Sequence, residues 1–275
     1  MAIHMGYMGY CKIAGVNLAC TSLSITKKTD PLFYDHIYGL RDQAGTGPES
    51  VKGDGGDGGF VSRQKGIYRS SRTTSSGSAS GPLLKGHFKE LMDTAIKGEV
   101  VAADFGLYFG KKKALLNAFI TSLTIDVKAG EAASFSVELI GTDIEDLESP
   151  PEVVACEKII TWDKCGIASE LTGDVMSFSL SISNPAIPIF VSGADDTLGP
   201  KEIRIGIQEV KGSISVYEAT EWPGGEISGI TFTVDGASYV LSATYSGPTN
   251  SPSTGPFVST IPFTGASDTF AWVAG

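Results

Sequence analysis

Carboxylates are plentiful in this 275-residue chain, but no pair of them stands out, and the spacing of the other chemically active residues favours no reaction. The three histidines are scattered, and no GxSxG or HExxH motif is present. Gly53, Gly55 and Gly58 satisfy a GxGxxG pattern, but the strand before it and the helix after it that a phosphate-binding loop needs are missing. The sequence therefore predicts a protein that is not an enzyme, with no catalytic residue, no cofactor and no metal site.

The four cysteines do not form a metal or redox motif. Cys11 and Cys20 are nine positions apart, as are Cys156 and Cys165, and neither pair has CxxC spacing. In a cytoplasm such residues are by default free, partly buried thiols, but disulfides formed later within or between subunits remain open.

The charge of the chain is unevenly distributed. The formal net charge is −10, and residues 151–275, with 5 basic and 14 acidic side chains, contribute −9 of it. An acidic surface repels nucleic acid, although solubility alone also accounts for it. By contrast, residues 60–81 contain four basic side chains and no acidic one.

A sequence pattern occurs twice, at a constant offset of 157 positions. Residues 22–33 read SLSITKKTDPLF and residues 179–190 read SLSISNPAIPIF. Both copies alternate polar and apolar side chains, which is typical of a strand with one buried face. The pattern predicts two similar β-domains in tandem, but the same alternation in residues 120–127 shows that ordinary strand chemistry is an alternative.

The elements expected along the chain are mostly strands. One apolar stripe predicts a helix over about residues 84–97, which Gly98 ends. Residues 118–127 and 134–140 predict a hairpin that turns at Ala129-Gly130, and Asp235-Gly236 predicts a second tight turn. Further alternating or apolar runs predict strands over residues 11–16, 19–25, 100–109, 158–162, 175–183, 201–217, 227–234, 238–245 and 257–263.

We expect a first domain over residues 1–150 and a second over 151–275, because four acids and Pro150-Pro151 form a linker-like stretch. The first domain has a Gly/Ser-rich insertion over residues 41–82, whose role stays open. Its basic second half also contains apolar side chains, which predicts a segment that orders on assembly. The candidate assembly contacts are Arg63, Lys65, Tyr68, Arg69 and Arg72.

Several segments resemble the bacteriophage tail tube (major tail) protein family. They are EKIITWDKCGI at 157–167, VMSFSLSISNPAIPIF at 175–190, LGPKEIRIGIQEVKGSISVYE at 198–218 and NAFITSLTIDVKAGEAASFSVELIGTD at 117–143. The resemblance implies a mainly β fold of tandem tail-tube-like β-sandwich or barrel domains with one short α-helix. It also implies a structural virion protein that polymerises into stacked rings, the conduit for genome ejection into the host. A tail hub, distal-tail or adhesin-type tandem β-sandwich protein is the alternative.

The resemblance also implies partners and a location. The chain would bind itself, as a pseudo-sixfold trimer or a hexamer, and other tail proteins, and DNA would pass through the lumen without specific binding. We expect it in the virion tail after synthesis in the host cytoplasm, with no membrane anchor, because no apolar run approaches the ~20 residues of a span. The hairpin 118–140 is the expected inner wall, because it is the longest clean alternation and contains no proline, and an outward, solvent-facing orientation is the alternative. Its candidate lumen-facing residues are Thr121, Thr124, Asp126, Ser134, Ser136 and Glu138.

Overall fold

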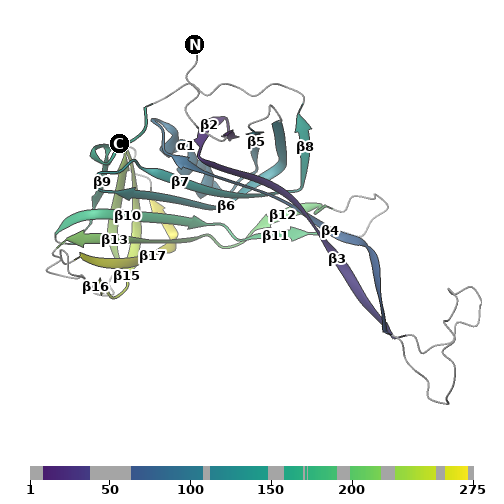
Figure 1. Cartoon of the computed structure of the whole chain (residues 1–275). Coiled ribbons are helices and arrows are strands. Elements are labelled where there is room, and N and C mark those ends of the chain that lie inside the picture. Colours follow the sequence, from purple (N-terminus) through teal and green to yellow (C-terminus); the bar gives the residue numbers. More distant parts are fainter. Residues whose placement is uncertain are drawn as a thin grey trace, which may run out of the picture.

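A computed structural model describes residues 9–37, 63–107, 112–147, 158–169, 171, 173–190, 199–217, 227–251 and 258–271. Strands dominate this part of the chain, which confirms the mainly β class (Figure 1). The first half contains β1 (Gly9–Ile13), β2 (Val16–Cys20), β3 (Ser22–Ile37), β4 (Arg63–Pro82), α1 (His87–Lys97), β5 (Val101–Leu107), β6 (Lys112–Lys128), β7 (Ser134–Gly141) and β8 (Asp143–Leu147). The second half contains η1 (Trp162–Lys164), β9 (Cys165–Ala168), β10 (Asp174–Ser183), β11 (Ala186–Ile189), β12 (Glu202–Ile205), β13 (Glu209–Tyr217), β14 (Ile227–Val234), β15 (Ala237–Tyr245), β16 (Thr249–Ser251) and β17 (Val258–Ala271). Within the described residues, no helix is long and apolar enough to cross a membrane.

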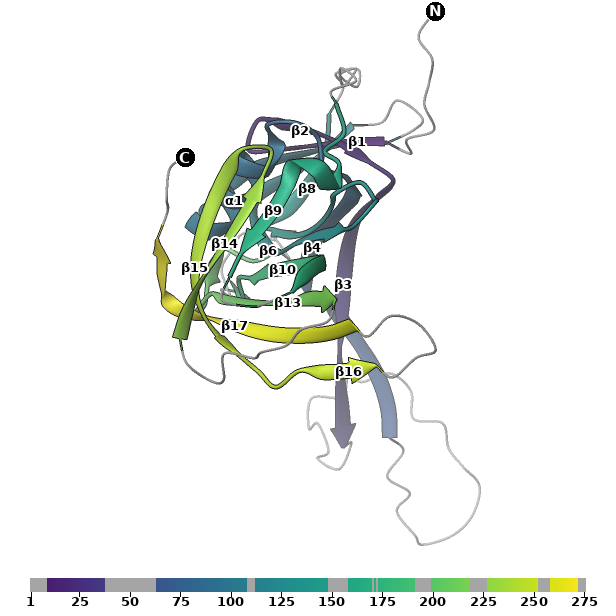
Figure 2. The ribbon, with the colours of Figure 1, turned by 90° about the vertical axis from the view of Figure 1, so that its left-hand side faces the viewer.

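Fifteen strands form one antiparallel sheet that curves around the core without closing on itself (Figure 2). The expected sandwich or barrel is therefore an open, strongly bent sheet. A path of neighbouring strands runs through it in the order β3-β4-β7-β6-β10-β13-β17-β16, and we call this path the polar sheet. At its centre, β6 of the first half pairs with β10 of the second.

Both halves of the chain place their strands in the same order. Neighbouring strands follow β3-β4-β7-β6-β5-β1 in the first half and β10-β13-β17-β15-β14-β9 in the second. The two SLSI segments lie at the start of β3 and in the last part of β10, and each pairs with the next long strand of its own half, β4 or β13. Ser22 lies opposite Ser80, and Ser179 lies opposite Ser213. The boundary at residues 150 and 151 lies outside the described residues and stays a prediction.

Residues 63–82 of the expected insertion form strand β4, so this part is not structureless, and whether residues 41–82 are an insertion stays a prediction. The strand pairs with β3 on one side and β7 on the other. Its glycines allow this packing, because a Cβ on Gly77 would collide with the Phe105 ring and one on Gly81 with the Ala19 carbonyl oxygen. Neighbouring strands therefore impose the extended conformation on a sequence with weak β-propensity. Residues 41–62 lie outside the described part of the chain.

Several local predictions are confirmed. Gly98 ends α1 in the left-handed region at φ 61°, and its N–H bonds to the carbonyl of Thr94. Gly130 and the Asp235-Gly236 pair have the positive φ values that their tight turns require. The helix begins at His87 rather than near residue 84, because Leu84 forms a β-bridge with Ile159.

Two boundaries differ from the predicted ones. The predicted strands 11–16 and 19–25 are instead β1, β2 and the start of β3, because Ala14 and Gly15 adopt positive φ and turn the chain. The predicted strand 201–217 is divided into β12 and β13. Ala14-Gly15 is the same dipeptide as at the predicted turn Ala129-Gly130, but the two runs beside it are short and the break within 201–217 has no turn dipeptide.

One hydrophobic core extends through both halves. Alternating residues of β6, β7 and β10 are buried in it, and α1 covers it with Phe88, Leu91 and Met92. In the second half, the Phe232 ring lies 5.6 Å from that of Phe178 and 5.7 Å from that of Phe263. The polar sheet thus has one face on the core and the other free.

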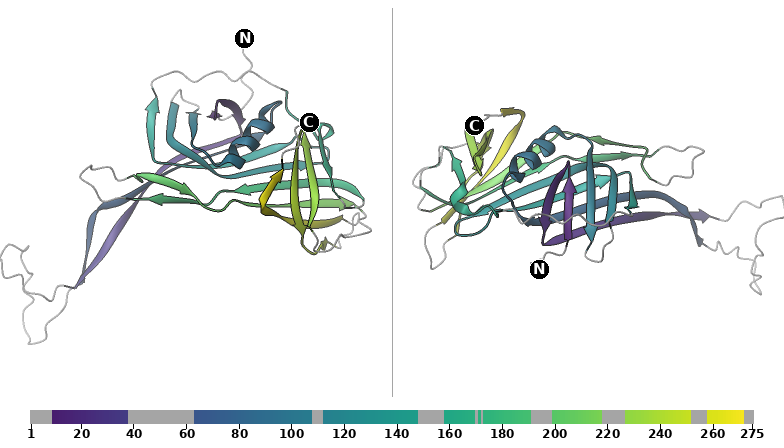
Figure 3. Two further views of the ribbon diagram at one scale, coloured as in Figure 1. Left: turned by 180° about the vertical axis from the view of Figure 1, so that it is seen from behind. Right: turned by 90° about the horizontal axis from the view of Figure 1, so that it is seen from above.

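Two hairpin arms project from the same side of the body (Figures 1 and 3). The long arm consists of residues 29–37 of β3 and 63–72 of β4, which pair only with each other. Pro31 lies at its register shift, between Asp30 and Leu32, where a missing N–H is tolerated. The short arm consists of β11 and β12.

Candidate functional site: the polar face of the sheet

The free face of the polar sheet, which we call the polar face, is covered mainly by hydroxyl groups. Residues of β6, β7 and β10 alternate between the core and this face. Strand pairing extends the alternation across the sheet in rows of side chains. One row is Ser22, Ser80, Ser136, Thr124, Ser181 and Lys211, and the next is Ser24, Ser78, Glu138, Ser122, Ser183 and Glu209. A third row is Pro82, Ser134, Asp126, Ser179, Ser213 and Pro262.

The structure brings all six predicted lumen-facing residues together on the polar face. Thr124 and Ser136 are directly opposite, as are Asp126 and Ser134. The Thr121 hydroxyl donates to the Glu138 carbonyl at 3.1 Å, and Thr121 and Glu138 line a shared groove. The Thr124 hydroxyl donates to that of Ser181 at 3.2 Å, across the junction of the two halves. That this face lines a channel stays a prediction.

The polar face carries neutral hydroxyl groups together with a small number of charged side chains. Its described charges have both signs, and they include Asp126, Glu138, Asp174 and Glu209 as well as Lys28, Lys128 and Lys211. Lys211 also forms an ion pair with Glu209 at 2.6 Å, which neutralises both. The described residues contain no group of three or more side chains suited to a metal ion. The concentration of acids in the second half is therefore not located on the described part of this face.

The junction of the two halves is closed by a polar clamp on the core side. Asn184, directly after β10, is fully buried, and its Nδ2 donates to the carbonyls of Ala95 and Ile120 at 2.8 and 3.0 Å. Gln208 donates to Asn184 Oδ1 at 2.7 Å and to the carbonyls of Ala95 and Ile96. The last carbonyls of α1, which a helix leaves without internal partners, are thus bonded by side chains of the second half.

A second contact ties the start of α1 to the same half. The Tyr239 hydroxyl donates to the Lys89 carbonyl at 3.0 Å and to Asp93 Oδ1 at 3.1 Å. Its ring meets Phe88 edge-on, with centroids 5.2 Å apart. Burial, with the charge of Asp93, raises the pKa of Tyr239 far above its usual range, so the hydroxyl remains a donor.

Sequence reasoning missed the clamp residues. Asn184 precedes Pro185, and an Asn-Pro dipeptide is typical of a turn rather than of a buried site. The available signal was its position, because Phe178, Leu180 and Ile182 alternate toward the core and Asn184 continues that series. A polar residue in a buried series indicates a partner in another element.

All five candidate assembly residues lie on β4, at or near the long arm. Arg72 is exposed at the base of the arm, with its guanidinium 5.2 Å from the centre of the Phe190 ring, just after the short arm strand β11. This cation–π contact joins the bases of the two arms. The side chains of Arg63, Lys65, Tyr68 and Arg69 lie outside the described part, and their role stays a prediction.

Cys11, Cys20 and Cys165 are free thiols, and Cys156 lies outside the described residues. Burial raises the pKa of Cys20 to about 12, that of Cys165 to about 11 and that of Cys11 well above its usual value. Since only the thiolate is nucleophilic, folded protein at pH 8 should leave Cys11 and Cys20 unalkylated by iodoacetamide, with Cys165 reacting slowly. Mass spectrometry should show all three modified after denaturation in urea. Rapid alkylation of Cys11 in folded protein would contradict this.

The family model for phage tail tube proteins matches residues 44–265, which is most of the chain. The chain therefore belongs to the phage tail tube protein family, and its role is that of a structural component of a phage tail. No curated protein matches it.

Proposed function

We propose that this protein polymerises into stacked rings that form the phage tail tube, the conduit for genome ejection. The observation that carries the proposal is the internal β6–β10 junction. It joins two halves with the same strand order into one continuous sheet. A contact that links the first half to the second within a chain can link the second half to the first half of the next chain.

The two ends of the polar sheet fit such a contact. In the described part of the chain, β3 pairs only with β4, and β16 pairs only with β17. By strand order, β3 corresponds to β10. Strand β16 pairs with β17 beyond the point where β15 ends. In the same way, the part of β6 that lies beyond β5 pairs with β7. Every pairing along the path is antiparallel, so β16 runs opposite to β3, and the β3 strand of a following copy can extend the sheet in the same sense.

Hydrogen-bonding groups of β3 point toward this open edge. Leu83, directly after β4, donates its N–H to the carbonyl of Ala133, directly before β7. Alternate residues of β4 in step with Leu83 therefore bond toward β7, and those between them, including Ser78 and Ser80, bond toward β3. Their partners Ser22 and Ser24 bond β4 in turn, which leaves the backbone groups of Leu23 and Ile25 directed away from it. An open strand edge of this kind favours pairing with another strand.

The contact we propose is head-to-tail, so repeating it yields a closed ring or an open filament. With residues 1–150 and 151–275 as equivalent domains, a ring of three chains has six domain positions, and a ring of six chains is the alternative. In either ring the polar face lines the lumen. Hydroxyl groups with few charges offer DNA phosphates neither a basic site nor a base-reading surface, so the genome passes without specific binding. The arms then reach other rings or other tail proteins.

Electron microscopy with site-directed labelling tests this proposal. Purified protein should form stacked rings or hollow tubes in negative stain. Thr124→Cys and Ser136→Cys should react with a small maleimide in assembled tubes but not with a maleimide on a carrier too large for the bore. Glu90→Cys on α1, on the opposite side of the sheet, should react with both. Subunits that never assemble would refute the ring. Labelling of Thr124→Cys by the large carrier in assembled tubes would refute the assignment of the polar face to the lumen.

A further inference from the structure

The rows of side chains on the polar face advance by two residues at the internal junction. The row that starts at Ser22 reaches Thr124, and Thr124 lies opposite Ser181 on β10. The counterpart of Ser22 at the offset of 157 positions is Ser179, two residues before Ser181. A row that leaves the first half therefore enters the second half two residues further along.

The second half carries the same kind of row to its own open edge. The row starts at Ser179 and passes through Ser213 and Pro262. It ends at Ser246, whose N–H donates to the Pro262 carbonyl at 2.8 Å. The same advance of two residues places Ser246 opposite Ser24 of a following copy.

A neighbouring row leads to the same register. It starts at Ser177, passes through Thr260 and ends at Thr249 on β16. Because Ser177 precedes Ser179 by two positions, this row meets a following copy two residues earlier, at Ser22.

We propose that β3 of a second copy pairs with residues 245–249 in the register that sets Ser24 opposite Ser246. This inference rests on the ring proposed above and specifies which residues of the two copies meet. A second copy of this chain is the partner because the contact repeats, between chains, the pairing of β6 with β10 within one chain.

The end of β14 limits this contact. Ile227 of β14 already pairs with Thr244, so the edge available to a second copy begins at Tyr245. In the proposed register, Tyr245 lies opposite Ile25, and the pairing ends there. A shift by one residue would turn Ile25 toward the polar face, because successive side chains of a strand point to opposite faces.

The residues between the two row ends leave room for the strand. Gly247 and Pro248 together lie opposite Leu23, as in a β-bulge. Both are exposed, and a Cβ on Gly247 would meet no atom within 4 Å. Leu23 is only partly buried in the single chain, whereas its counterpart Leu180, which pairs with β6, is 3% exposed. Pro248 therefore offers Leu23 an apolar surface, at an edge position where the missing N–H of proline is tolerated.

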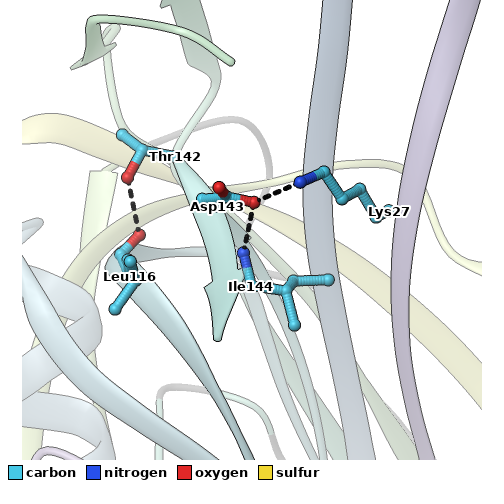
Figure 4. A network of polar contacts seen from close by, with 5 residues as sticks. All are labelled: Lys27, Leu116, Thr142, Asp143 and Ile144. Carbon is cyan, nitrogen blue, oxygen red and sulfur yellow. Dashed lines mark hydrogen bonds and ion pairs between the residues drawn. The ribbon is translucent and has the colours of Figure 1, made fainter. Parts of the chain in front are cut away.

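The edge strand is held in place by its own subunit. The Lys27 ammonium bonds to Asp143 Oδ1 at 2.7 Å (Figure 4). Asp143 also accepts from the Ile144 N–H, and the adjacent Thr142 hydroxyl donates to the Leu116 carbonyl at 3.2 Å. These bonds tie β3 to β8 in addition to its pairing with β4, so the edge is ordered before a partner binds, which lowers the entropic cost of the contact.

Disulfide formation between introduced cysteines tests the register in assembled rings. Leu23 and Ile25 direct their backbone groups across the junction, so Ser24 and Ser246 form a non-hydrogen-bonded pair with Cα atoms about 4.5 Å apart. A disulfide can span that distance. Diamide should therefore link rings of Ser24→Cys/Ser246→Cys head to tail, because it takes up the two thiol hydrogen atoms as the S–S bond forms. Electrophoresis without reductant should show a ladder that ends at the number of chains in a ring.

Two matched variants probe registers shifted by two residues. In the proposed register, Ser22→Cys/Ser246→Cys and Thr26→Cys/Ser246→Cys each hold the two cysteines about 7–8 Å apart. Because that separation exceeds the reach of a disulfide, each should yield roughly tenfold less linked product. The single variants Ser24→Cys and Ser246→Cys measure the background from the chain's own thiols.

The outcomes separate this inference from the ring itself. Thr124→Cys/Ser181→Cys is the internal counterpart, with hydroxyls 3.2 Å apart, and should close a disulfide within each chain in free subunits and rings alike. If the internal pair links but rings link best through a shifted pair, or through none, the register is refuted and the ring proposal stands. A lack of rings from the unchanged protein would refute both.

A charge pair gives an independent readout that needs no cysteine. Ser24→Glu with Ser246→Glu places like charges directly opposite each other across the junction. Assembly, followed by light scattering, should be roughly threefold slower than for Ser24→Lys with Ser246→Glu. Ser22→Lys with Ser246→Glu, in which the lysine is shifted by two residues, should restore less of the rate. Equal rates from the first two variants would overturn the proposal.

Discussion

Leu23→Pro is expected to abolish ring formation while the subunit remains folded. The Leu23 N–H points toward the open edge of β3, so its removal breaks no bond to β4. It takes away a donor for the next copy, and the proline ring occupies the space that a paired strand needs. Negative-stain microscopy should show no rings, and circular dichroism should show a strand content like that of the unchanged protein.

The matched control is Leu23→Ala. Leu23 packs partly against the core, and both substitutions remove that contact, but alanine keeps the N–H. Leu23→Ala should therefore assemble. Ser24→Pro, one position along, removes an N–H that bonds β4 and should destabilise the subunit itself. Normal rings from Leu23→Pro would show that β3 is not the edge that pairs between copies.

Asn184→Ala is expected to have the largest effect on the stability of the subunit. Asn184 is fully buried and links α1, β6 and Gln208, so its loss leaves the Ile120 carbonyl and a Gln208 N–H without partners. Buried groups left unbonded cost about 1–3 kcal/mol each, and the total loss in free energy of unfolding should be about 3 kcal/mol. Urea unfolding monitored by circular dichroism measures it.

Ser183→Ala is the control for that experiment. Ser183 is adjacent in sequence but points to the polar face, where its hydroxyl remains close to water. Its removal should change the free energy of unfolding by less than about 0.5 kcal/mol. Similar losses from the two variants would mean that the clamp contributes little beyond ordinary strand packing.

The sequence predicted those elements whose own residues determine their conformation. The alternation of β6, β7 and β10 and the turn at Asp235-Gly236 are local signals, and all are confirmed. Strand β4 was missed because its serines and glycines carry no strand signal, and its conformation comes from β3, β7 and the Phe105 ring.

In the candidate site, too, the sequence predicted only the residues whose position follows from a local pattern. Alternation placed Thr124 and Ser136 on one face because the period of a strand is fixed. The clamp of Asn184 and Gln208 joins residues 24 positions apart to a helix 89 positions away, and such distances are set by tertiary structure alone. The open edges of β3 and β16 are likewise properties of the whole sheet and not of any segment.

The two arms differ greatly in length, since the strands of the short arm have only four residues each. In the proposed ring, long and short arms would alternate around the circumference. A ring of identical domains could be placed on the ring below it in as many orientations as there are domains. Alternating arms halve that number, because a long arm fits only where the neighbouring ring presents a site for a long arm. The difference in arm length would thus fix the rotation of each added ring about the tube axis relative to the ring before it.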